Sequence, residues 1–142
     1  MIKSFKGKYE FLSNFATCRV VYNGVLYPTV EHAYQAAKCL HDEDRKVFRF
    51  IDTPGEAKRW GRVVTLRPDW ESVKLSIMED LVRQKFRNER LRKLLLETAG
   101  EELVEGNTWK DTFWGVCNGV GENNLGKILM KIREEILNDS VN

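Results

Sequence analysis

The spacing of apolar and polar residues predicts a β-hairpin followed by a helix in the first third of the chain. Residues 19–27 carry β-branched and aromatic residues on both sides of Asn23-Gly24. An Asn-Gly pair supplies the two positive φ angles of a type I′ turn, so the segment is typical of a hairpin. Thr29 then serves as the N-cap of a helix that runs to about Leu40, because apolar residues recur there at helical spacing: Val30, Ala33, Tyr34, Ala37 and Leu40.

Further helices are predicted along the rest of the chain. The segment Thr53-Pro54-Gly55-Glu56 is a capping box with proline at the first helical position, and Gly61 ends the short helix that it opens. Arg67-Pro68-Asp69 begins a longer helix with a core side of Trp70, Val73, Ile77, Leu81 and Val82. A short helix ends near Gly100 and buries Leu91, Leu94 and Leu95, and a final helix follows Asn124 and buries Leu125, Ile128, Leu129, Ile132 and Ile136.

The stretch 106–124 differs from the rest of the chain because it has four glycines, two tryptophans and almost no periodicity. A long ordered loop of this composition is typical of binding. The pattern as a whole predicts an α+β fold, a mostly α-helical single domain over residues 1–142 with one small hairpin sheet.

Composition excludes several classes of protein. No apolar run approaches the ~18 residues that span a bilayer, and the amino end has no apolar segment typical of a secretory signal. The three cysteines are far apart and form no C-x-x-C pair, which indicates reduced thiols and a cytoplasmic protein. His32, Cys39 and His41 match no metal-ligand spacing, and no G-x-G-x-x-G or Walker loop occurs. We therefore expect neither a metal nor a cofactor, and no membrane partner.

Positive charge is concentrated in the middle of the chain. Residues 45–93 hold 14 Lys and Arg against 7 Asp and Glu, a local net charge of +7 in a chain whose formal net charge is +2. Such a run is usually a solvated face of long helices, and it also suits a site for phosphate or another anion. The sequence leaves both interpretations open.

Glu31, Gln35 and Lys38 share one face of the first predicted helix, beside its apolar stripe. The partial positive charge at the helix start stabilises the ionised Glu31, and a desolvated lysine such as Lys38 can lose its proton and act as a nucleophile. The alternatives are an ordinary first-turn glutamate and a lysine exposed to solvent.

Other residues suit ligand binding as well as structure. Phe11 to Phe15 are either a core strand or two aromatic rings around the ligand-orienting Ser13 and Asn14. Trp70 is typical of a core, whereas Trp109 and Trp114 suit base stacking. Asp111 is typical of a turn, and the helix start 123–126 is typical of an N-cap or a phosphate site.

Seven short segments in order resemble the NADAR family, also called YbiA-like. They are Tyr9-Glu10-Phe11-Leu12-Ser13-Asn14-Phe15, Tyr27-Pro28-Thr29-Val30-Glu31-His32-Ala33-Tyr34-Gln35-Ala36-Ala37-Lys38, Ala57-Lys58-Arg59-Trp60-Gly61-Arg62, Arg67-Pro68-Asp69-Trp70-Glu71-Ser72-Val73-Lys74, Leu103-Val104-Glu105, Asp111-x-x-Trp114-Gly115, and Asn124-Leu125-Gly126-x-x-Leu129-Met130-x-x-Arg133. The resemblance implies a hydrolase that cleaves the N-glycosidic bond of a riboside. Its substrate would be ADP-ribose on guanine in DNA or RNA, or alternatively a ribosylamino-pyrimidine phosphate of riboflavin biosynthesis. A non-catalytic binder of ADP-ribose or nucleotides is the third expectation.

The resemblance also implies roles for single residues. Glu31 would activate water or stabilise positive charge at the anomeric carbon, and Lys38 would form an imine with ring-opened ribose. Asp111 would be a second acid or base, or a hydroxyl binder. Lys74 matches another family lysine, so it is the alternative to Lys38. The substrate-binding residues would be Phe11, Ser13, Asn14, Phe15, Arg62, Trp70, Lys74, Trp114, Gly115, Asn124 and Gly126.

Overall fold

The computed structural model describes the backbone of residues 1–141 and the side chains of residues 1–139. It divides into two compact units. Unit 1 consists of Met1–Ser13 together with Phe86–Asn142, and unit 2 consists of Asn14–Lys85. Helices dominate, and one antiparallel pair of strands is the only sheet in the described part, which confirms the predicted α+β class.

Unit 2 begins with the predicted hairpin. Strand β1 (Thr17–Tyr22) pairs with β2 (Val25–Thr29), with Tyr22 opposite Val25 at the turn. Asn23 and Gly24 have φ angles of 48° and 78°, the left-handed backbone that the type I′ turn requires.

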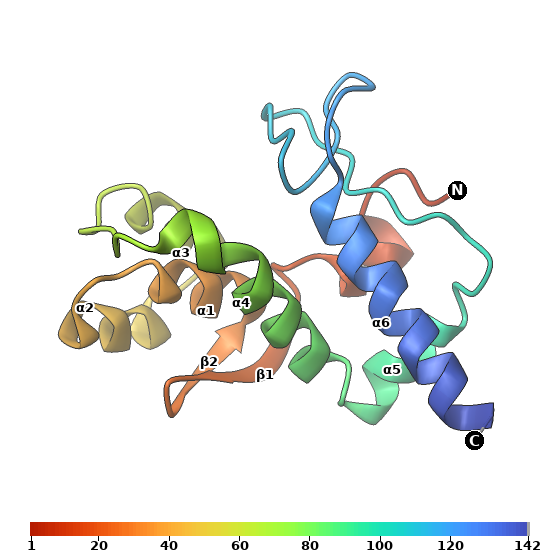
Figure 1. Ribbon diagram of the computed structural model, residues 1–142, viewed down its shortest axis with the longest axis horizontal. Helices are drawn as coiled ribbons and strands as arrows, with labels where there is room; N and C mark the ends of the chain where they lie inside the picture. Colours follow the sequence, from red (N-terminus) through yellow and green to blue (C-terminus); the bar gives the residue numbers. More distant parts are fainter. Residues whose placement is uncertain (142) are drawn as a thin grey trace. The chain divides into compact units, whose positions relative to one another are not determined.

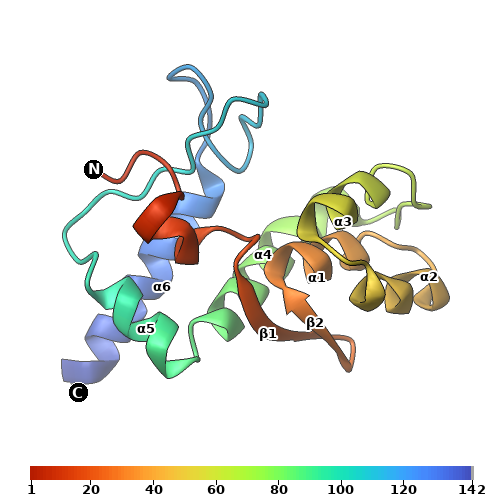
Figure 2. The ribbon, with the colours of Figure 1, turned by 180° about the vertical axis from the view of Figure 1, so that it is seen from behind.

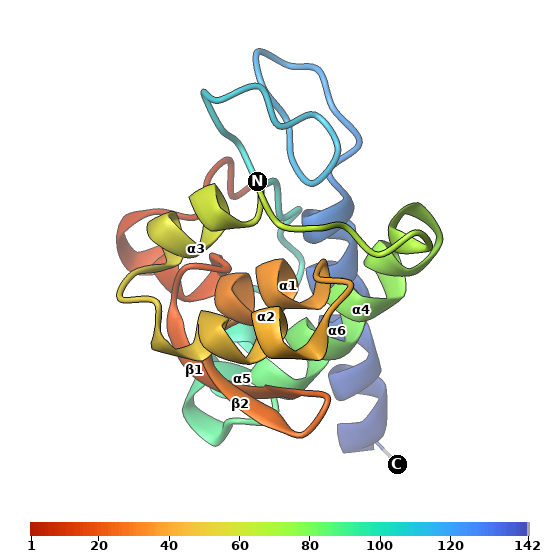
Figure 3. The ribbon, with the colours of Figure 1, turned by 90° about the vertical axis from the view of Figure 1, so that its left-hand side faces the viewer.

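Helix α1 (Val30–Ala37) follows directly and lies in the middle of unit 2 (Figure 3), in contact with the hairpin, α3 and α4. All eight of its residues are buried, including Glu31 and Gln35, so the predicted polar stripe is part of the interior. The helix ends earlier than predicted. The N–H groups of Lys38 and Cys39 bond to carbonyls only three residues back, and Leu40 is 46% exposed.

Three helices and one short 3₁₀ segment complete unit 2: α2 (Asp42–Val47), η2 (Phe48–Phe50), α3 (Pro54–Trp60) and α4 (Trp70–Lys85). The predicted start and end of α3 are confirmed, because Thr53 Oγ1 accepts the Glu56 N–H and Gly61 ends the helix. The prediction for the core side of α4 is partly wrong. Val73 and Ile77 are only half-buried, whereas Met78 is buried together with Trp70, Leu81 and Val82.

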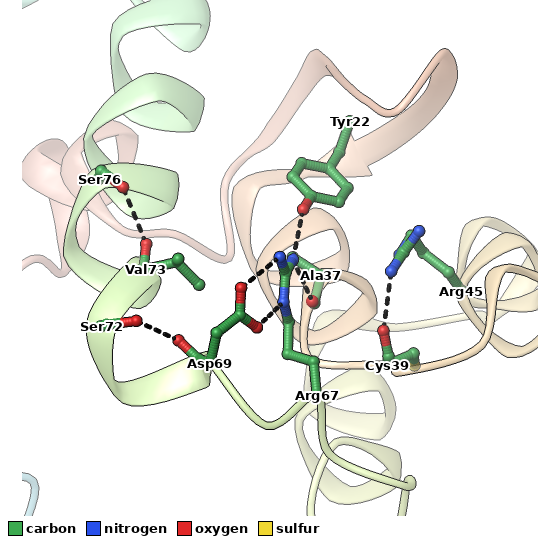
Figure 4. Close-up of polar contacts among 9 residues, drawn as sticks. All are labelled: Tyr22, Ala37, Cys39, Arg45, Arg67, Asp69, Ser72, Val73 and Ser76. Carbon is green, nitrogen blue, oxygen red and sulfur yellow. Dashed lines mark hydrogen bonds and ion pairs between the residues drawn. The ribbon is translucent and has the colours of Figure 1, made fainter.

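Arg67 ties the start of α4 to the hairpin and to the end of α1 (Figure 4). Its guanidinium donates to both carboxylate oxygens of Asp69, at 2.6 and 3.1 Å, and to the hydroxyl of Tyr22 at 2.8 Å. Its backbone N–H donates to the carbonyl of Lys38 at 2.9 Å. These bonds fix the position of the Lys38 backbone.

In unit 1, α5 (Glu89–Leu96) contacts both η1 (Gly7–Leu12) and α6 (Asn124–Val141), and Figures 1 and 2 show the ribbon of these elements. The two predicted helices are present, but α5 ends at Leu96 and not near Gly100, and Leu94 and Ile136, which were expected to be buried, are half-buried. A strand over Phe11 to Phe15 is wrong because η1 extends through Leu12. Leu91, Leu95, Leu103, Leu129 and Ile132 are buried. In the described part of the chain, no helix has the length and apolar character needed to cross a membrane.

Candidate active site

The carboxylate of Glu31 lies in the first turn of α1 and is 7% exposed. Its backbone N–H donates to the carbonyl of Asn14 at 3.1 Å, and its Oε1 accepts the side-chain N–H of Gln35 at 2.9 Å. The positive end of the helix stabilises a carboxylate at this position. The site therefore contains a buried acidic group with a defined orientation.

Lys38 follows the last residue of α1 and is half-buried. Its ammonium lies 5.6 Å from the centre of the Tyr34 ring, and that ring packs on Trp70 with 5.1 Å between ring centres. Burial lowers the pKa of Lys38, Glu31 opposes this effect, and the positive charges of Arg62, Lys74 and Lys58 lower the pKa further. A larger share of this amine is therefore neutral, which a lysine nucleophile requires.

Three further cations act on Lys38 from two other elements. Lys58 belongs to α3, Arg62 follows α3, and Lys74 belongs to α4. The Lys74 ammonium is paired with Glu71 at 2.6 Å, and its side chain is only 16% exposed. Part of the positive run in the sequence is therefore close enough to Lys38 to act on its amine, and this concentration of positive charge favours an anionic ligand.

The remaining predicted residues of unit 2 differ in their surroundings. Trp70 is 5% exposed and belongs to the core, where it supports Tyr34. The side-chain amide of Asn14 contacts the sulfur of Met78 at 3.5 Å, and Phe15 is 41% exposed. Thus the amine of Lys38 interacts electrostatically with three other predicted site residues of this unit: Glu31, Arg62 and Lys74. The carbonyl of Asn14 accepts the backbone N–H of Glu31.

Unit 1 holds the other predicted residues. Asp111 Oδ1 accepts the N–H groups of Phe113 and Trp114, at 3.1 and 2.9 Å, which is the turn chemistry that its sequence position also suggested. The Asn124 amide donates to the carbonyl of Phe113 at 3.0 Å. The remaining members are Phe11, which is buried, Ser13, which is half-buried, and Gly115 and Gly126.

Gly115 and Gly126 have a steric reason to be glycine. A Cβ atom at Gly115 would overlap the backbone carbonyl of Glu105, and one at Gly126 would overlap the carbonyl of Leu103. Close packing within unit 1 therefore requires both glycines, whatever they do toward a substrate.

Sequence reasoning did not assign Lys58, Gln35 or Gly61 to the site. Lys58 was one charge among many, whereas the position of Gln35 four residues after Glu31 was a usable signal. The contact of Gly61 with Gln35 depends on the packing of α3 against α1, so no local pattern indicates it.

A cavity of about 450 Å³ also lies in unit 2, but it contains none of the predicted residues. Its lining is mainly apolar: Asp44, Val47, Phe48, Ile51, Trp60, Val63, Val64 and Thr65. Within unit 2 the chemistry of the side chains, and not the size of this cavity, indicates the site around Glu31.

Comparison with known proteins gives a consistent result across sequence and fold. The model of the NADAR domain matches residues 2–137. The N-glycosidase YbiA of Escherichia coli (strain K12) is 42% identical over 132 residues, which cover 90% of this chain and 82% of that protein. An N-glycosidase of Nostoc punctiforme is 42% identical over 137 residues, 92% of this chain and 87% of that protein.

A solved structure and a longer relative extend the comparison. The NMR structure of the E. coli protein YbiA matches 100% of this chain and 90% of its own, with a TM-score of 0.85 and 37% identity. A riboflavin biosynthesis protein of Vibrio vulnificus is 41% identical over 133 residues, which cover 89% of this chain but 35% of that protein.

Proposed function

The chain belongs to the NADAR family, and on that basis we propose that it is an N-glycosidase that removes ADP-ribose from ADP-ribosylated guanine in nucleic acid. The enzyme class rests on the relatives named N-glycosidases. One observation carries the chemistry: a buried carboxylate, Glu31, and a half-buried amine with a lowered pKa, Lys38, share a site with three other cations.

The reaction breaks the bond between the anomeric carbon of ribose and a nitrogen of the base. The base nitrogen keeps the electron pair of that bond and takes up a proton, while the anomeric carbon gains the oxygen of water. Glu31 accepts the proton of the attacking water or stabilises the positive charge that develops at the carbon. Arg62, Lys58 and Lys74 offset the negative charge of the substrate's phosphates.

Lys38 adds a covalent route. When the ribose ring opens, the ring oxygen takes up a proton and C1 becomes doubly bonded to the base nitrogen. The neutral amine of Lys38 adds to C1, the bond from C1 to the base breaks, and the base leaves with that electron pair and a proton, so that C1 is now an imine of Lys38. Water hydrolyses this imine, which returns the lysine and gives the C1 aldehyde. Lys74 is the alternative amine. Cyanoborohydride, which reduces an imine by hydride transfer, would trap the adduct on the reacting lysine, and peptide mass spectrometry would identify that lysine.

A release assay tests the proposal. Purified protein is incubated with an oligonucleotide that carries ADP-ribosyl-guanine and, separately, with a ribosylamino-pyrimidine phosphate. Glu31→Gln is the matched control, because its side chain has the same shape and its carbonyl still accepts from Gln35. We expect the wild type to release ADP-ribose and the variant to lose most activity. Equal release by both proteins would contradict a catalytic Glu31.

The second candidate is an N-glycosidase of riboflavin intermediates. The similarity to a Vibrio vulnificus protein named for riboflavin biosynthesis favours it, although this chain spans only a third of that protein. Release of ribose 5-phosphate from the pyrimidine substrate alone would support this candidate. Binding of ADP-ribose without release from either substrate would leave a non-catalytic module.

A further inference from the structure

The two ends of the Gln35 side-chain amide differ: one is hydrogen-bonded, and the other is buried without a hydrogen-bond partner among the described residues. Its amide N–H donates to Glu31 Oε1 at 2.9 Å, but its carbonyl oxygen is buried, and no donor among the described residues reaches that oxygen. The opposite orientation of the amide would place two acceptors face to face, so the carboxylate itself fixes which end faces it. Gln35 is 4% exposed, so solvent has little access to the unpaired oxygen.

An unsatisfied buried carbonyl lowers the stability of a fold, and most buried polar atoms in proteins are paired. Leucine, of similar size, would avoid this cost. The benefit of glutamine at this position is therefore the hydrogen bond that its amide nitrogen donates to Glu31, which holds the carboxylate in one orientation.

Gly61 provides the space for this arrangement. Its φ and ψ angles are −61° and −19°, ordinary right-handed helical values that any residue adopts, so the backbone does not require glycine. A Cβ atom at Gly61 would instead overlap the carbonyl oxygen of Gln35 and lie 2.7 Å from its Cδ. The absence of a side chain at Gly61 lets the Gln35 amide reach its position.

We propose that Gln35 is a positioning residue for the catalytic carboxylate of Glu31, and that Gly61 is glycine so that the Gln35 amide can occupy its place. This inference rests on the proposed role of Glu31. The loop residue after α3 thereby acts on the carboxylate through Gln35, without contact with the substrate.

The first test leaves Gln35 unchanged and alters only the space beside it. Gly61→Ala should lower kcat for base release by about tenfold to a hundredfold, the range of a hydrogen bond to a charged group, and should change KM little. Gly55→Ala, in the helix α3 that Gly61 ends, is the control, because its Cβ would meet only Thr53 Oγ1, at 4.0 Å. Gly55→Ala should retain activity within about twofold.

A double-mutant cycle then asks whether Gly61 acts through Gln35. A Gln35→Ala background removes the amide atoms that the new Cβ would overlap and leaves only the Cβ of residue 35, at 3.3 Å, so adding Gly61→Ala should lower kcat little further. An undiminished effect of Gly61→Ala in that background would overturn the proposal, as would a Gly61→Ala protein with wild-type kcat.

A pH profile separates positioning from a merely structural role. The Gln35 donor favours the ionised carboxylate, so Gln35→Leu should move the acidic limb of the kcat profile to higher pH. A loss of thermal stability with an unmoved limb would contradict the inference. If the wild type releases no base from either substrate, the proposed function itself fails. If Glu31→Gln retains full activity, the catalytic role of Glu31 fails while the glycosidase function stands, and both results are distinct from a failure of the Gln35 variants alone.

Discussion

The hydroxyl of Thr29 holds the beginning of α1, and Thr29→Val tests how strongly the fold depends on it. Thr29 Oγ1 accepts the backbone N–H of His32 at 2.9 Å and lies 2.7 Å from His32 Nδ1. The other ring nitrogen, Nε2, lies 2.8 Å from the carbonyl of Ile51. A carbonyl only accepts, so Nε2 carries a proton, and Nδ1 of a neutral ring accepts from the Thr29 hydroxyl.

Valine keeps the shape of threonine but leaves the His32 N–H and Nδ1 without their partner. His32 is 1% exposed, so water does not replace the hydroxyl. With about 1–3 kcal/mol for each of these two unsatisfied buried groups, Thr29→Val should lower the free energy of unfolding by about 2–6 kcal/mol.

Thr53→Val is the matched control, because Thr53 caps α3 through the Glu56 N–H at 3.2 Å in an exposed setting. Water can replace that hydroxyl, so the loss should be about 0.5–1 kcal/mol. Urea unfolding at pH 7, followed by circular dichroism, measures both losses. Equal losses for the two variants would refute the argument from burial and the His32 ring.

Three other predictions concern charge and close packing. The Arg67 guanidinium lowers the pKa of Asp69, so Asp69→Asn should lower the urea midpoint near pH 7, and the difference between the two proteins should diminish as the pH falls below about 4, where the carboxyl of the unfolded chain becomes protonated. The lowered pKa of Lys38 should make its amine react faster with an acylating reagent at pH 8 than exposed lysines do, and peptide mapping with Lys38→Arg as the blank checks this. Gly126→Ala should lower the melting temperature by several degrees, whereas Gly55→Ala should not, because only the former meets a backbone carbonyl.

The parts of the fold that sequence predicted are those with local signals. The pair Asn23-Gly24 made the hairpin predictable, because two adjacent positive φ angles are energetically costly for most other residues. The capping box fixed α3 because one side chain bonds the helix start. Helix α2 was missed, since its six residues include five charged ones and no apolar period.

The candidate site depended on a different kind of information. Helical spacing and the family resemblance identified Glu31 and Lys38 as candidate site residues. The sequence pattern, however, predicted that their face of the helix lies at the border of the core. Only the packing of α1 against the hairpin, α3 and α4 buries Glu31 and Gln35. Gln35 and Gly61 are 26 positions apart and lie close together only because of that packing, so no local sequence pattern could have predicted their contact.

This burial has a consequence for the chemistry of Lys38. Desolvation lowers the pKa of its amine, and the positive charges of Arg62, Lys74 and Lys58 lower it further. The negative charge of Glu31 raises this pKa. In the proposed function, a bound phosphate offsets these positive charges, and so it weakens the effect that keeps the amine neutral. Burial of the lysine does not change in that way, because it comes from the fold around the end of α1. Desolvation is the largest cause of the lowered pKa of Lys38, and it is therefore the part of the arrangement that can keep the amine reactive while an anionic substrate is bound.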